Sequence, residues 1–165
     1  MGARLPLCIV GGILMLSSLI LPTLFYRHVG GEYFGVDIYG VFIYWMAGFF
    51  FTQVVTGGEW GIQTVSPYTD FVPDVLGIIC IIIIIAGAIL TVLLGSATEH
   101  KAAAVGGMLG IIGMLSFFIG VNMGSPLTNL YELHNDGYYF APFIGFFVCI
   151  IGGILALVGG TLKKQ

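Results

Sequence analysis

The stretch VLGIICIIIIIAGAILTVLL, residues 75–94, decides the fold class of this chain. Fourteen of its twenty residues are isoleucine, leucine or valine, and none is charged. About twenty apolar residues suffice for a helix to cross the hydrocarbon core of a bilayer. Each of these side chains favours insertion by about 0.3–0.6 kcal/mol. The stretch therefore predicts a membrane-spanning helix.

Three further uncharged stretches have a similar length, at residues 5–26, 102–121 and 139–162. Across all 165 residues only 8% are charged and 58% are hydrophobic, whereas a soluble domain carries about 25% charged residues. This composition excludes a soluble enzyme, a nucleic-acid-binding protein and a disordered chain. We expect a single membrane domain over residues 1–165, with bilayer lipids as partners and no nucleic acid.

The segment 38–56 leaves two topologies open, because it is nearly long enough to cross but contains residues that prefer the water boundary. With four spans, all 23 aromatic residues fall in the outer half of a helix or in the external loops 27–74 and 122–138. A fifth span would spoil this pattern. We predict an all-α, antiparallel four-helix transmembrane bundle, capped by an interfacial helix or small β-sheet from the first loop. Five spans are the alternative.

The basic residues give an orientation for the four-span arrangement. Arg4, Lys101, Lys163 and Lys164 then lie on one side, which the positive-inside rule makes cytoplasmic. Five spans give the same four-to-one division, so the basic residues do not choose between the topologies. We predict a plasma-membrane protein with both termini in the cytoplasm.

Small residues recur at helical spacing in the third and fourth spans. Because lipid gives helices no hydrophobic reason to associate, close backbone contact at small residues supports their packing. We predict that the helix contacts are made at Gly106, Gly110, Gly113, Gly120, Gly145, Gly152, Ala156 and Gly160.

The predicted spans contain no Asp, Glu, Lys, Arg or His. Pumps and coupled transporters place ionisable groups at membrane depth, so a pump or secondary transporter formed by this chain alone is not expected. The three cysteines lie inside apolar runs, and no nucleophile stands in a catalytic pattern. We therefore predict no enzyme activity, no cofactor and no disulfide.

Two groups of loop residues are candidate sites. Glu132, His134 and Asp136, with His28 in the other loop, could hold a divalent cation if the loops meet, but solvated loop residues are the favoured interpretation. Trp and Tyr are frequent interface anchors and are also common at the membrane boundary. The candidate interface residues are Trp45, Trp60, Tyr39, Tyr44, Phe49 and Phe50.

The order of loops resembles the claudin and peripheral-myelin-protein superfamily: a long first external loop, a six-residue link at 96–101, and a shorter second external loop. The opening GGILMLSSLILP, residues 11–22, also resembles small prokaryotic four-span proteins. Claudins carry a Gly-Leu-Trp motif and two cysteines in the first loop, and this chain lacks both. The resemblance implies a capped helix bundle that associates laterally or between cells, and it transfers no residue role.

These observations predict a non-catalytic four-span membrane protein that acts through protein contacts. Its partners would be other membrane subunits, as an accessory component, or copies of itself. The alternative is a passive channel or transporter component whose acidic outer loops attract cations.

Overall fold

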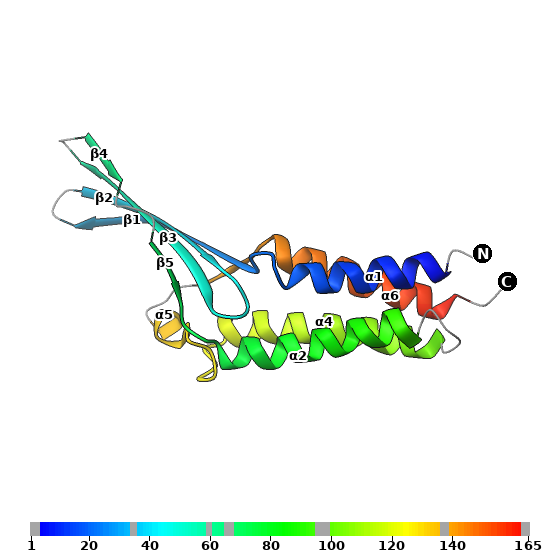
Figure 1. Cartoon of the computed structure of the whole chain (residues 1–165). Helices are drawn as coiled ribbons and strands as arrows, with labels where there is room; N and C mark the ends of the chain where they lie inside the picture. The colour runs from blue at the N-terminus through cyan, green and yellow to red at the C-terminus, as the bar shows by residue number, and fades with distance from the viewer. Residues whose placement is uncertain are drawn as a thin grey trace.

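The computed structural model combines a bundle of helices with an antiparallel sheet (Figure 1). It describes residues 4–33, 36–58, 61–64, 68–94, 100–135 and 139–162. Within these ranges, only the backbone is described at 4, 28–33, 36–39, 54–58, 61–64, 68, 94 and 100.

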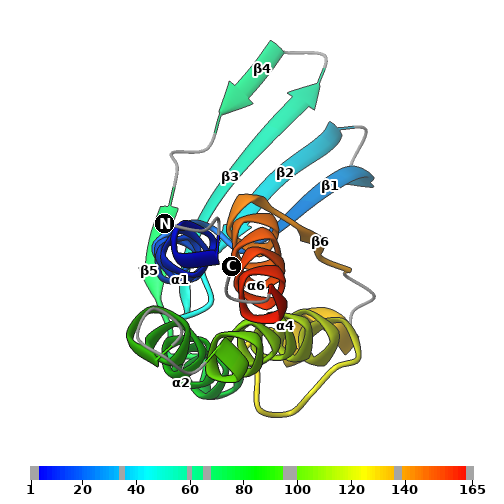
Figure 2. The ribbon, with the colours of Figure 1, turned by 90° about the vertical axis from the view of Figure 1, so that its right-hand side faces the viewer.

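The described residues form four long helices, α1, α2, α4 and α6. They lie side by side, and helices that pack on each other run antiparallel (Figures 1 and 2). The first, α1, packs on α6, which packs on α4, and α4 packs on α2. Both termini lie at one end of the bundle, and the sheet and the short helix α5 lie at the other (Figure 1). The bounds are α1 Arg4–Ser18, α2 Val75–Ile89 with its π-helical continuation η1 Leu90–Leu94, α4 His100–Asn122, α5 Tyr131–Asn135 and α6 Ile144–Thr161.

The sheet has six strands, all paired antiparallel, in the order β4-β3-β2-β1-β6, with β5 also paired to β3. Its long strands run from the end of the bundle to well beyond it (Figure 1). The strands are β1 Leu24–Tyr33, β2 Val36–Tyr44, β3 Phe49–Gly58, β4 Gly61–Thr64, β5 Tyr68–Phe71 and β6 Ala141–Pro142.

The prediction of an all-α four-helix bundle is wrong, because this sheet is a main part of the fold. Residues 38–56 form neither an interfacial helix nor a fifth span, since they lie in β2, β3 and the turn between them. Both strands are rich in β-branched and aromatic side chains, which suit a pleated surface. The sheet is also larger than a local cap, because β6 joins it from the second loop.

The first predicted span, residues 5–26, is helical only as far as Ser18. Pro22 ends the helical run, because proline lacks the N–H that a helix needs and biases the preceding residue towards extended backbone. From Leu24 the chain is already in β1. The 15 residues of α1 rise about 22 Å, against about 30 Å for the hydrocarbon core.

Three other helical segments are long and apolar enough to span a membrane: Val75–Leu93, Lys101–Asn122 and Ile144–Thr161. The composition of the outward faces agrees with a membrane protein, since large apolar side chains are exposed along every long helix. Examples are Ile13 on α1, Ile82 on α2, Ile112 on α4 and Ile151 on α6, each more than half exposed. A soluble bundle would place charged or polar residues on such faces.

Glycines lie where the helices meet. A side chain at Gly106 would collide with the Gly87 carbonyl oxygen of α2, and a Cβ at Gly152 would lie 2.7 Å from the Gly11 carbonyl oxygen of α1. The α4 glycines do not all face the same helix. Gly106, Gly113 and Gly120 face α2, whereas Gly110 faces Met15 of α1. In α6 the small residues Gly145, Gly152, Ala156 and Gly160 are all buried.

Two buried glycines of α4 should respond differently to alanine. At Gly107 the new Cβ would meet backbone, 2.5 Å from the Gly153 carbonyl oxygen and 2.8 Å from the Leu157 nitrogen of α6. At Gly110 the obstacle is the flexible end of Met15, which can rotate away. We expect Gly107→Ala to lower the free energy of unfolding by about 1–3 kcal/mol, and Gly110→Ala to change it by less than about 1 kcal/mol. Denaturant titration in mild detergent measures both, and equal losses would contradict the predicted backbone contact.

Candidate functional site

The turn between β2 and β3 lies against the first turn of α2, where the sheet joins the bundle. Gly48 adopts a φ of 106°, a left-handed conformation that favours glycine. Its carbonyl accepts a hydrogen bond from the Val72 N–H at 3.0 Å. A side chain at Gly77 would collide with the Met46 carbonyl oxygen, so α2 needs glycine where the turn touches it. The sheet and the bundle are thus in backbone contact.

A fully buried carboxylate, Asp74, connects three parts of the chain at this contact. Its Oδ1 accepts a hydrogen bond from the Gly77 N–H at 2.7 Å, which caps the N-terminus of α2. Its Oδ2 lies 2.8 Å from the Tyr44 hydroxyl at the end of β2. The same oxygen accepts from the Thr128 hydroxyl at 2.6 Å and from the Asn129 N–H at 3.3 Å, both after α4. Both carboxylate oxygens are therefore occupied by groups of the protein.

Tyr44 is fully buried and stacks on Phe117 of α4, with ring centroids 6.3 Å apart. Burial raises the pKa of its hydroxyl well above the usual value, and the charge of Asp74 raises it further. The hydroxyl therefore keeps its proton and remains a donor. It also lies 2.6 Å from Asn129 Oδ1, and its single hydrogen serves one of the two acceptors at a time.

A second polar connection holds the segment that leads to β6. Asn122, at the end of α4, accepts a hydrogen bond from the Phe140 N–H at 2.8 Å and donates one to the Phe140 carbonyl at 3.1 Å. Phe143 then donates its N–H to the Thr23 carbonyl at 2.9 Å, just before β1. The base of the sheet is thus also attached through the segment between α4 and α6, which bonds to the end of α4 and to the residue before β1.

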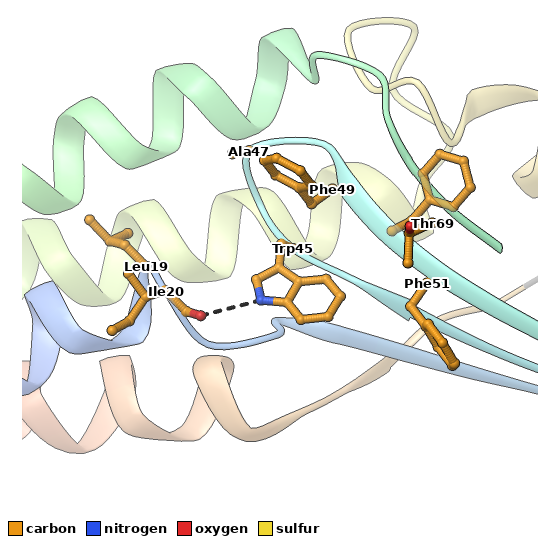
Figure 3. Close-up of a pocket in the computed structure, with 8 residues that line it drawn as sticks. Leu19, Ile20, Trp45, Ala47, Phe49, Phe51 and Thr69 are labelled. Atoms are coloured by element: carbon orange, nitrogen blue, oxygen red, sulfur yellow. Dashed lines mark hydrogen bonds between the residues drawn. The ribbon is translucent and has the colours of Figure 1, made fainter. Parts of the chain in front are cut away.

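Asp74, Tyr44, Thr128 and Asn129 form what we call the Asp74 cluster. Beside it lies an apolar groove of about 550 Å³, shown in Figure 3. One wall comes from the residues after α1, and the other from the β2–β3 hairpin and β5. The Trp45 indole N–H donates a hydrogen bond to the Ile20 carbonyl at 3.3 Å and joins the two walls (Figure 3). The lining residues are Leu19, Ile20, Trp45, Ala47, Phe49, Phe50, Phe51 and Thr69.

The predicted interface residues have different surroundings. Trp45, Phe49 and Phe50 line the groove, and Phe49 is 55% exposed and packs against the Phe71 ring at an interplanar angle of 37°. Tyr44 lies in the core, so it offers no surface to a partner. The side chain of Tyr39 lies outside the described part of the structure, and so does all of Trp60.

The predicted metal ligands are only partly described. Glu132 is exposed on α5. The His134 ring packs against Gly124 and edge-on against Tyr139, at 5.5 Å between ring centroids. Asp136 and the side chain of His28 lie outside the described residues. Among the residues that are described, no three His, Cys, Asp or Glu side chains are grouped to hold a metal ion.

Asp74, Thr128 and Asn129 were not singled out from the sequence. One signal for Asp74 was available, since it stands immediately before an apolar helix, where Asp is a preferred N-cap residue. Thr128 and Asn129 follow Asp74 in the sequence by 54 and 55 positions. No local sequence pattern indicates a contact over such a separation.

Within the described residues, the arrangement is suited to holding the sheet rigidly and to accepting apolar groups. The buried carboxylate has no free oxygen for a substrate, and the cysteines Cys8, Cys80 and Cys149 are buried in the helices. Comparison with protein-family models finds no match, and no curated protein matches the chain.

Proposed function

We propose that this chain is a non-catalytic plasma-membrane protein that acts through protein contacts made by its sheet. In this proposal α2, α4 and α6 cross the bilayer, and α1 enters it from the cytoplasmic side, with the residues after Ser18 completing the passage. Both termini are then cytoplasmic, and the sheet is external. The position of both termini at the end of the bundle away from the sheet supports this arrangement (Figure 1). Lys101 is exposed at the end of the bundle where both termini lie, and this position agrees with the positive-inside rule.

The observation that carries the proposal is the outer edge of β1. This strand runs from Leu24 to Tyr33, but its pairing with β6 covers only Leu24 and Phe25. Among the described residues, the backbone edge from Arg27 to Tyr33 has no paired strand on the side away from β2. An uncovered strand edge is a template for pairing with another chain, because its N–H and C=O groups point outward in a row.

The attachment of the sheet supports the same role. Asp74 and Asn122 hold its base with buried or half-buried hydrogen bonds. A rigid binding edge loses less conformational entropy on association than a mobile loop does. The order of external and internal segments also supports the proposed likeness to the claudin and peripheral-myelin-protein superfamily, whose members have this succession of loops.

Cysteine cross-linking in native membranes tests the proposal. Arg27 is exposed on β1, just beyond the last residue paired with β6. Because the three native cysteines are buried, a maleimide carrying a benzophenone should react mainly with an introduced Arg27→Cys thiol, and on illumination the benzophenone bonds to a C–H group of whichever chain lies beside it. We expect a discrete cross-linked product, which is a dimer of this chain if it self-associates and a larger heteromer if it is an accessory subunit.

The matched control is Thr69→Cys, exposed on β5 across the base of the sheet from β1. It should give much less product than Arg27→Cys at the same expression level. A monomer alone from both variants would contradict a contact function, and equal products from both would contradict the assignment to the β1 edge.

A further inference from the structure

The first helix does not reach across the hydrocarbon core. Its 15 residues rise about 22 Å of a core about 30 Å thick. In contrast, α2 and η1 together run from Val75 to Leu94, which is about 30 Å. The outer part of the membrane beside α1 is therefore faced by the residues after Ser18 and by the β2–β3 hairpin, where the groove lies.

The groove is continuous with the exposed apolar face of α1. Ile13, Leu16 and Ile20 follow one another at helical spacing, and their exposed fractions are 52%, 41% and 79%. Ile20 is at once the last member of this row and a wall of the groove. On the hairpin side, Phe49 is 55% exposed, and the neighbouring Phe71 and Val72 are 45% and 43% exposed. A lipid acyl chain that lies along α1 in the bilayer thus meets the groove without crossing a polar surface.

The lining selects an apolar occupant. Six of the eight lining residues are leucine, isoleucine, alanine or phenylalanine. The indole N–H of Trp45 is already bonded to the Ile20 carbonyl, and Thr69 supplies the one side-chain hydroxyl of the lining. At about 550 Å³ the groove falls within the range of about 300–1,000 Å³ that is usual for small-molecule sites.

We infer that the groove holds one acyl chain of a bilayer phospholipid, in the leaflet nearer the sheet. The chain enters from the α1 face and lies between Ile20 and Phe49, so that it fills the depth that α1 leaves uncovered. The Trp45 ring, at the level of the first turn of α2, would contact the part of the chain near the head group. This inference requires only that the helices lie in a bilayer, and it is independent of what the sheet binds.

Fluorescence quenching by brominated lipid tests the inference on the full chain. The chain has two tryptophans, so Trp60→Phe leaves Trp45 as the sole reporter. The purified protein in mild detergent is titrated with phosphatidylcholine brominated on the acyl chain near the head group. We expect quenching that saturates at one lipid per protein molecule. Quenching should be weaker when the bromines are near the methyl end of the acyl chain.

Two further variants, each made in the Trp60→Phe background, separate the groove from the general lipid surface. Ala47→Phe places a ring in the groove and should weaken the saturable quenching by about tenfold or more. If this variant does not fold, Ile20→Ala is used instead. It removes part of one wall of the groove and should also weaken the saturable quenching. Ile112→Phe, on the exposed face of α4, should leave it unchanged.

Three outcomes would overturn the inference. Quenching in simple proportion to the brominated fraction would show non-specific lipid contact only. Saturation by brominated free fatty acid but not by brominated phospholipid would show a different ligand. Insensitivity of the saturable quenching to both Ala47→Phe and Ile20→Ala would place the lipid elsewhere on the chain.

Discussion

Asp74→Ala should lower the free energy of unfolding by about 3–5 kcal/mol, among the largest effects of any single substitution in this chain. The change removes the acceptor for the Gly77 N–H, the Thr128 hydroxyl and the Asn129 N–H, and one of the two acceptors near Tyr44. Each buried donor left without a partner costs about 1–3 kcal/mol. Denaturant or thermal unfolding in mild detergent measures the loss.

Two other variants test whether the effect belongs to this cluster. Tyr44→Phe removes one donor but leaves Asp74 bonded to its three others, so we expect a loss of only about 1 kcal/mol. Glu132→Ala removes an exposed carboxylate on the short helix α5 and should change stability by less than about 0.5 kcal/mol. If Asp74→Ala were no worse than Glu132→Ala, the buried carboxylate would not hold the sheet to the bundle.

Gly77→Ala should lower the free energy of unfolding by about 2–3 kcal/mol, even though alanine is the better helix former by about 1 kcal/mol. The new Cβ would collide with the Met46 carbonyl oxygen, which is backbone and cannot rotate away. The β2–β3 turn must then move off α2, taking Trp45 with it. We expect a lower unfolding temperature together with a change in Trp45 emission.

Gly120→Ala is the matched control for Gly77→Ala. Gly120 is also a helical glycine with a close neighbour, but the neighbour is the flexible side chain of Leu76. Its substitution should be nearly neutral and should leave Trp45 emission unchanged. A neutral Gly77→Ala would mean that the turn is not held against the helix.

The helices α2, α4 and α6 could be predicted closely from the amino-acid order. Residues 75–94 and 102–121 correspond to α2 with η1 and to α4, and residues 139–162 contain α6. The reason is that burial in lipid depends on the hydropathy of about twenty consecutive residues, which is a local property. The wrong prediction for residues 19–26 has a local cause too, since the uncharged run continues past Pro22, where a helix is interrupted.

The sheet was much harder to predict. Residues 32–45 are rich in β-prone side chains, but both alternating faces of this stretch are apolar, so its pattern does not distinguish a half-buried strand from an apolar helix. Strand order depends on pairings between distant segments, such as Phe25 with Ala141. The candidate site has the same difficulty, because the groove joins Ile20, Phe49 and Thr69 from three separate segments.

Composition and hydropathy alone predicted a membrane-type chain and the helices α2, α4 and α6, because the preference for lipid sums over neighbouring residues. Only the folded arrangement showed that the end of the first apolar run enters strand β1 and that a buried Asp74 joins the sheet to the bundle. It also brought together the residues that line the groove beside α1. These features arise from contacts between residues far apart in the chain, whose free energy exists only once the backbone has brought them together.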